Sequence, residues 1–171
     1  MGVLDRGRFF RTRRNHATEH ATIHLLTPKY RGAALAGRAD AKGFFLYGRV
    51  DTEDVRKAVQ EAIGRLPAEP ELAVHPRCGT NVVVTGLVAG LASLVAVASM
   101  PQERRRGSTF GETLPRLLVA GSLAAFAGAG LGPTVQERYT TSPDTRGVTI
   151  KEVRRMERGS TVIHRVLLEG P

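Results

Sequence analysis

A histidine pair near the N-terminus has the spacing of a metal site. His16, Glu19 and His20 form the pattern H-x-x-E-H in a segment without proline up to Pro28, which predicts a helix over residues 5–26. Residues four apart project from one face of a helix, so both imidazoles can bind the same ion. Glu19 lies one turn from His16, where a carboxylate can take the proton of a metal-bound water. The sequence therefore predicts one divalent ion, zinc by its ligands, with Glu19 as the catalytic base.

The remaining ligands are expected from the segment His75-Pro76-Arg77-Cys78. Cys78 is the only cysteine, so it forms no internal disulfide, and thiolate sulfur is a common zinc ligand. Three protein ligands would leave a position for water, as catalytic zinc requires, whereas four would close the site and make it structural. The residues leave the third ligand open between Cys78 and His75. The alternative for Cys78 is a small, buried and inert side chain.

The other histidines have ordinary interpretations. His24 continues the helix face of the pair by one turn, and we expect it beside the metal ligands or in solvent. His164 falls in a predicted strand, where a histidine is usually hydrogen-bonded or exposed. The alternative for the whole N-terminal group is a polar helix face with solvated histidines.

Two uncharged segments predict a membrane-spanning hairpin. No charged residue occurs from Thr80 to Met100 or from Leu117 to Gln136, and each segment is close to the length of about 20 residues that crosses a bilayer. The second segment has small residues, Gly128 among them, at a spacing that suits close helix packing in lipid. The alternative is a pair of buried helices in a water-soluble protein, but the rest of the chain is too polar to surround them.

The remaining segments predict an α+β fold. Two short strands are expected within residues 33–50, a helix over 51–66, a strand over 71–75 and a C-terminal β-hairpin that turns at 157–160. The prediction is an α+β membrane protein of three regions. These are residues 1–79, with the N-terminal helix, a β-β-α-β unit and the metal site; 80–136, the two-helix transmembrane hairpin; and 137–171, the C-terminal β-hairpin.

The charge of the chain agrees with a membrane protein. It has 25 Lys and Arg against 16 Asp and Glu, and basic flanks favour anionic lipid headgroups. Aromatic residues make up 5% of the chain and Trp is absent, so a base-stacking surface, and with it a nucleic-acid partner, is not expected. The expected partners are the lipid bilayer and either a second copy of the chain or a larger membrane complex.

The orientation in the membrane follows from two opposing signals. The N-terminal residues lack the apolar run and cleavage site of a secretory signal, and the single thiol suits a reducing compartment. The basic run Arg104–Arg106 between the apolar segments favours the opposite orientation, because short basic loops tend to stay inside. We expect an integral protein of the cytoplasmic membrane whose soluble parts are cytoplasmic.

Three functions fit these residues. The first is a membrane-bound zinc-dependent hydrolase, such as a peptidase, because inverted zinc metallopeptidases use the H-x-x-E-H order. The second is a metal-stabilised, non-catalytic scaffold or subunit of a membrane complex, with a closed metal shell. The third is a basic protein that binds lipid or nucleic acid without a metal, with an affinity that falls steeply with salt.

Three blocks of the sequence resemble the YqhQ-like group of bacterial membrane proteins of unknown function. They are HATEHATIH, HPRCGTN at the first apolar segment and VQERYTTSPDT after the second, over roughly residues 14–145. The resemblance implies a bacterial membrane protein. Because the group is predicted to be metal-dependent, it also implies a metal role for His16, Glu19, His20, His75 and Cys78. It implies no substrate, and this chain is shorter than the longer members and has fewer membrane segments.

Overall fold

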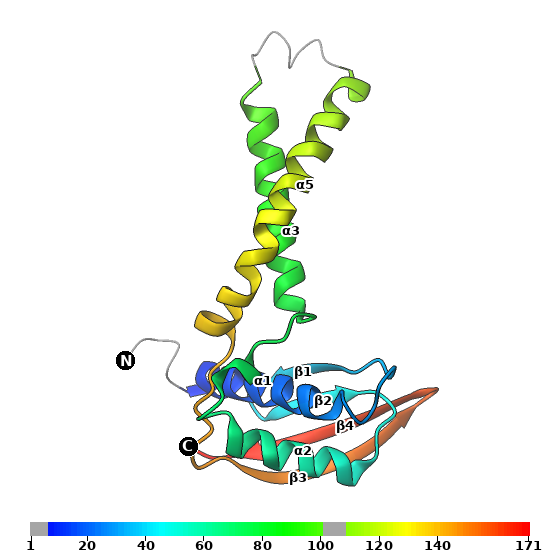
Figure 1. Ribbon diagram of the computed structural model, residues 1–171, viewed down its shortest axis with the longest axis vertical. Coiled ribbons are helices and arrows are strands. Elements are labelled where there is room, and N and C mark those ends of the chain that lie inside the picture. Colours follow the sequence, from blue (N-terminus) through cyan, green and yellow to red (C-terminus); the bar gives the residue numbers. More distant parts are fainter. Residues whose placement is uncertain (1–6, 101–108) are drawn as a thin grey trace. The chain divides into compact units, whose positions relative to one another are not determined.

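The computed structural model describes residues 7–100 and 109–171, and Figure 1 labels its elements. The chain divides into two compact units. The first combines the residues up to His75 with the segment Gln136–Pro171, and the second is the segment Pro76–Val135 between them. The basic run Arg104–Arg106, on which one argument about orientation rests, lies outside the described residues.

The first unit is built on an antiparallel sheet whose described strands have the order β1-β2-β4-β3. The strands are β1 (Ala36–Asp40), β2 (Gly43–Tyr47), β3 (Thr149–Arg158) and β4 (Thr161–Glu169). They confirm the two strands expected within residues 33–50 and the C-terminal hairpin. Because β2 pairs with β4, with Phe44 opposite Val166, the first and third predicted regions share one sheet.

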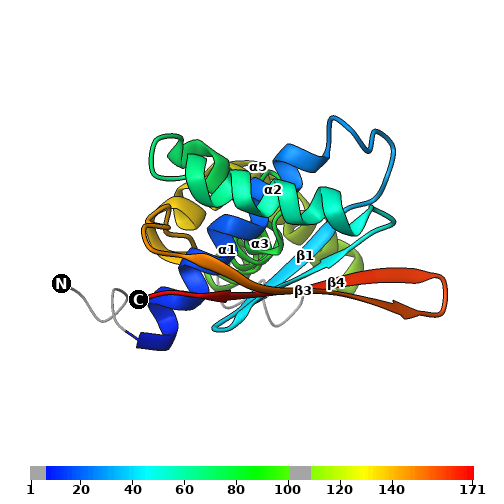
Figure 2. The same ribbon diagram turned by 90° about the horizontal axis from the view of Figure 1, so that it is seen from below.

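Two helices, α1 (Gly7–Leu26) and α2 (Thr52–Arg65), cover one face of this sheet (Figure 2). Both agree with the expected helices to within two residues at each end. α2 begins at Asp51, whose carboxylate accepts hydrogen bonds from the backbone N–H groups of Glu53 and Asp54. This is the capping that an aspartate at the N-cap provides, and it fixes where the helix starts.

The hydrophobic core of the first unit lies between the sheet and the two helices. Alternate residues of β2 and β4 point into it, as the two-residue period of a strand requires. α1 contributes Ile23 and Leu26 to this core, both from its C-terminal third. The middle of α1, residues 14–22, is largely polar although most of it is buried, and it carries the candidate site.

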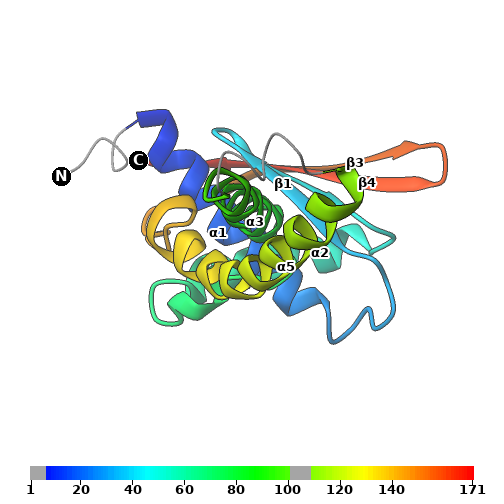
Figure 3. The same ribbon diagram turned by 90° about the horizontal axis from the view of Figure 1, so that it is seen from above.

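The second unit is a hairpin of two apolar helices, α3 (Gly79–Ala98) and α5 (Phe110–Val135), which lie side by side (Figure 3). Both are long and apolar enough to cross a membrane, by length and composition. Large apolar side chains point outward from both, among them Val82 and Phe126, which are 72% and 83% exposed. Such a surface is unusual for a hairpin in water.

Small residues of α5 pack against α3 within this hairpin. A Cβ atom added at Gly128 would lie 3.1 Å from the Cβ of Val88 and 3.3 Å from the Cα of Thr85. Gly132 meets Asn81 in the same way, and a Cβ there would lie 3.1 Å from the Asn81 Cα. Glycine at these positions therefore lets the two helices of one chain approach each other closely.

The strand expected over residues 71–75 is wrong. Pro70–Ala73 forms a 3-10 turn, η2, which Pro70 can start because its fixed φ and missing N–H suit the first position of a helical turn. The next residue, Val74, is extended, but the carbonyls of Ala73 and Val74 accept hydrogen bonds from histidine rings. Side-chain donors therefore replace the neighbouring strand that the pattern ELAVH indicated.

His164 on β4 makes the stability of the first unit depend on pH. Its side chain is fully buried, and Nε2 lies 3.1 Å from the hydroxyl of Thr52. Burial, helped by the charge of Arg155, lowers the pKa of His164 below its ordinary value of 6.5. Below that value the unfolded chain binds a proton that the folded chain does not, so the free energy of unfolding falls as the pH falls.

We therefore expect the melting temperature to fall between about pH 7.5 and pH 5.5, and to fall less in His164→Gln, which keeps a polar group near Thr52. Thermal unfolding followed by circular dichroism measures this. An equal pH dependence in the two proteins would show that other groups carry it.

Candidate metal centre

The middle of α1 is a polar helix that is buried on nearly all sides. Thr18, Glu19, His20 and Thr22 are all less than 5% exposed. The two threonine hydroxyls are satisfied within the helix, since Thr18 donates to the Arg14 carbonyl and Thr22 to the Thr18 carbonyl. The larger polar side chains need partners outside the helix, because an unpaired buried polar group costs roughly 1 to 3 kcal/mol.

His16 and His20 lie next to each other on this helix, as their spacing predicts. Their ring centroids are 4.3 Å apart, and one ligand atom of each lies within 4.8 Å of the other. In a tetrahedral zinc site, two histidine nitrogens at about 2.0–2.1 Å from the ion would be roughly 3.4 Å apart.

Backbone carbonyls fix the tautomer of both rings. Nδ1 of His16 lies 3.0 Å from the carbonyl oxygen of Thr140, and Nδ1 of His20 lies 2.7 Å from that of Ala73. A carbonyl oxygen only accepts, so each Nδ1 must carry the hydrogen, and the lone pair of each neutral ring is then on Nε2. Metal-binding histidines are usually oriented in this way, with one nitrogen on a carbonyl and the other on the ion.

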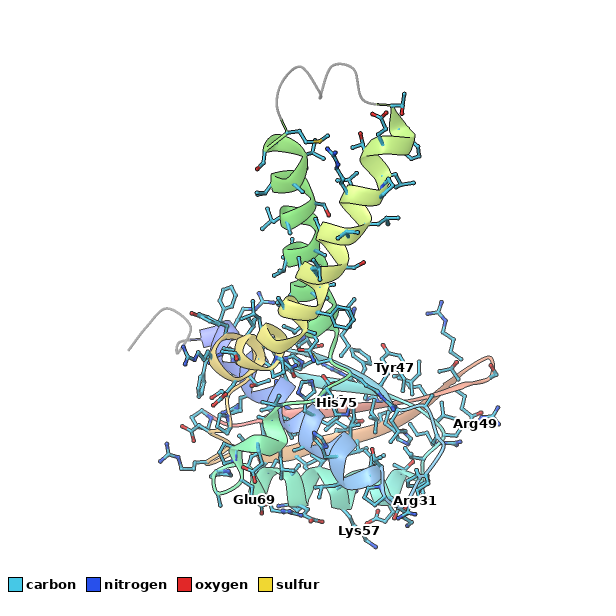
Figure 4. The ribbon with its side chains drawn as sticks, turned by 45° about the horizontal axis from the view of Figure 1, so that its top comes forward. Arg31, Tyr47, Arg49, Lys57, Glu69 and His75 are labelled. Atoms are coloured by element: carbon cyan, nitrogen blue, oxygen red, sulfur yellow. The ribbon has the colours of Figure 1, made fainter. Side chains whose placement is uncertain are left out.

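The other two histidines of the group also lie at this face. His24 donates from Nε2 to the Val74 carbonyl at 2.9 Å, so its tautomer is the reverse of that of the pair. The ring of His75 (Figure 4) lies 5.6 Å from that of His20 and 4.8 Å from that of His24, measured between centroids. The face therefore brings together His75 and the pair, whereas His24 is turned toward the backbone.

Two chain segments supply the carbonyl oxygens that accept hydrogen bonds from these rings, and both are next to the helical hairpin in the sequence. The first contains Ala73, Val74 and His75, and the His75 N–H donates to the side-chain oxygen of the buried Gln136 at 3.0 Å. The second is Gln136–Thr140, one turn of π-helix, η3, closed by a hydrogen bond from the Thr141 N–H to the Gln136 carbonyl. The last carbonyls of a helix have no partner in the helix, which leaves that of Thr140 for His16.

The carboxylate of Glu19 lies against β1. A Cβ atom added at Gly37 of β1 would lie 2.3 Å from its Oε1 and 2.4 Å from its Cδ, so the carboxylate occupies the space beside the glycine and would have to shift if a side chain were added there. Among the described residues, no carboxylate joins His16 and His20 in a group with metal-ligand spacing. The role of Glu19 as a base stays a prediction.

Cys78 belongs to the second unit, three residues after His75. It is the N-cap of α3, and its sulfur accepts a hydrogen bond from the Thr80 N–H at 3.4 Å. The N-terminus of a helix favours negative charge, which suits the thiolate form that binds metals. Near the pair, the sequence did not indicate Gln136 or the residues whose carbonyls accept hydrogen bonds from the histidine rings, Ala73, Val74 and Thr140. Backbone acceptors leave no signal in a sequence, and Gln136 was visible only as the polar end of an apolar segment.

The fold and this face define an α+β domain with a histidine pair on α1, of which His20 is buried, and an apolar helical hairpin inserted into its chain. Residues 11–153 match the family described as "Domain of unknown function (DUF6391)", and the chain belongs to that family. An uncharacterised protein of Picosynechococcus sp. (strain ATCC 27264 / PCC 7002 / PR-6) is 38% identical over 144 residues, which cover 76% of this chain and 65% of that protein. The chain thus spans less than two thirds of this relative. No solved structure matches it.

Proposed function

We propose that this chain is a membrane-anchored metal-binding protein, with His16, His20 and Cys78 as the ligands of one zinc ion. The observation that carries the proposal is the pair of Nδ1–H groups fixed on the carbonyls of Thr140 and Ala73. A hydrogen bond from one ring nitrogen to a carbonyl, with the lone pair of the other left for the ion, is the usual arrangement of a metal-binding histidine, and both rings have it. The resemblance to the YqhQ-like group supports the same proposal.

The position of Cys78 along the chain supports it as the third ligand. His75 is held at the face by its backbone bond to Gln136 and by its ring contacts. Three residues of extended chain span at most about 11 Å, so the Cα of Cys78 stays within that distance of the Cα of His75. Thiolate with two imidazoles is a ligand set typical of zinc. His75 remains the rival third ligand, or a fourth one.

An ion at this site would stabilise the fold around the hairpin. The site would lie where both segments that adjoin the hairpin, 73–75 and Gln136–Thr140, contact α1. Structural metal sites contribute their binding free energy to folding, because the unfolded chain does not hold the ligands together. We therefore favour a scaffold, or a subunit of a larger membrane complex, as the role of the protein.

Purified without a metal-affinity tag, the protein should contain about one zinc per chain, as elemental mass spectrometry measures it. His20→Ala and Cys78→Ser should each lose most of the metal, since each removes one ligand. His24→Ala is the matched control, because its ring lies at the same face but donates to the Val74 carbonyl. It should keep the zinc.

Freshly purified wild-type protein that contains no zinc would contradict the proposal. Equal loss in His24→Ala would point to general damage of the face instead of a specific site. If Cys78→Ser keeps its zinc and His75→Ala loses it, His75 is the third ligand, and the rest of the proposal stays as it is.

The membrane part of the proposal rests on the composition and exposure of α3 and α5. Both are apolar, and Leu87 in the middle of α3 is 62% exposed. We expect the protein to stay in the membrane pellet after an alkaline carbonate wash. Leu87→Arg should shift part of it to the soluble or degraded fraction, because a central arginine costs roughly 2.5 to 3.5 kcal/mol on insertion, whereas Leu87→Ala should not. Complete release of the wild type by the wash would contradict a spanning hairpin.

A zinc-dependent hydrolase is the second candidate, and one feature favours it. Three protein ligands would leave the fourth zinc position for water, and Glu19 is a buried carboxylate one residue from His20. As a base, Glu19 would have to leave Gly37 and reach that water. Against a panel of peptide and ester substrates, Glu19→Gln should then keep its zinc and lose at least about 100-fold in kcat. Activity that survives this change would show that Glu19 is not the catalytic base.

A further inference from the structure

A cavity of about 400 Å³ lies at one end of the sheet in the first unit, apart from the histidine face. Arg11 and Arg14 of α1 line it together with Lys42 from the β1–β2 turn and Lys151 of β3. Glu169, at the end of β4, is its acidic residue. Four cationic side chains from three separate parts of the chain therefore surround one carboxylate.

Arg14 is the unusual member of this group, because it is only 2% exposed. Its Nη1 donates to a main-chain oxygen of Pro171, the last residue of the given sequence, at 2.7 Å, and its Nε–H is buried with no hydrogen-bond partner among the described residues. A buried donor without a partner is costly, so this Nε–H is available to a bound acceptor.

The carboxylates near the cavity do not balance its charge. Glu169 lies 3.8 Å from Lys151, and Asp144, which also acts on Arg14, binds the exposed Arg146 through both oxygens. Arg65 on α2, by contrast, has two acidic partners, Glu61 and Glu69. The cavity therefore has an excess of positive charge that a bound anion would neutralise.

We propose that this cavity binds a phosphate group. The planar fork of an arginine and the mobile ammonium groups of two lysines are the donors that recognise phosphate oxygens. The volume also leaves space for a small group attached to the phosphate. Such a phosphate could come from a soluble phosphate ester or from the headgroup of an anionic lipid, and the experiment separates the two sources.

Binding of inorganic phosphate would be measured by isothermal titration calorimetry at constant ionic strength, with the full chain in an uncharged detergent. Saturable binding is expected. Lys42→Ala should weaken it roughly three- to tenfold, since it removes one charged donor. Glu169→Gln should strengthen it by a similar factor, because the competing carboxylate is lost and Lys151 is released. Lys57→Ala, an exposed lysine of α2 outside the cavity, is the control and should bind like the wild type.

Short-chain phosphatidylglycerol and short-chain phosphatidylcholine are then added in the same detergent. Displacement of phosphate by the anionic lipid alone assigns the site to a lipid headgroup, and no displacement by either assigns it to a soluble phosphate. Both results keep the site. The proposal is overturned if the wild type binds neither inorganic phosphate nor phosphatidylglycerol, or if Lys57→Ala weakens binding as much as Lys42→Ala. A Glu169→Gln variant that binds more weakly would also contradict it.

Discussion

The hydrogen bonds between the histidine rings of α1 and backbone carbonyls are the interaction on which the rest of the structure depends. A helix as polar as α1 can be buried only if its large side chains find partners, and three of its histidines find them on carbonyl oxygens. Those carbonyls belong to residues with no strand or helix partner of their own, Ala73, Val74 and Thr140. One set of hydrogen bonds thus satisfies both the helix and the irregular segments beside it.

This constraint also connects the fold with the proposed function. The same bonds that bury α1 fix the tautomers of His16 and His20, so the two proposed ligands would be oriented before an ion binds. They hold the segments on either side of the helical hairpin against α1, with Gln136 bonded to the backbone of His75. A zinc ion bound there would strengthen contacts that already exist, which agrees better with a structural role than with a water-activating one, since Glu19 rests on Gly37.

Most helices and strands, and the position of the histidine pair, were predictable because they have strong local signals in the sequence. Asp51 marks the start of α2, the alternating apolar residues mark β2 and β4, and the four-residue spacing places His16 beside His20. The pairing of β2 with β4 was not predictable, because no local pattern indicates which two strands pair when the helical hairpin lies between them in the chain. The segment 71–75 has a strand-like pattern, yet histidines, not a strand, satisfy its carbonyls. The direction of Glu19 depended on Gly37, a glycine without a local signal.

The X-ray absorption spectrum of tag-free protein at the zinc edge is the most direct test of a zinc site on α1, because it reports the ligands themselves. A site made of His16, His20 and Cys78 predicts nitrogen neighbours at about 2.0–2.1 Å from two imidazoles and one sulfur at about 2.3 Å, and no sulfur neighbour around whatever zinc Cys78→Ser still holds. A spectrum with the imidazole shells but no sulfur would give the third position to His75. A spectrum without imidazole scattering, unchanged by His20→Ala, would contradict a metal site on α1.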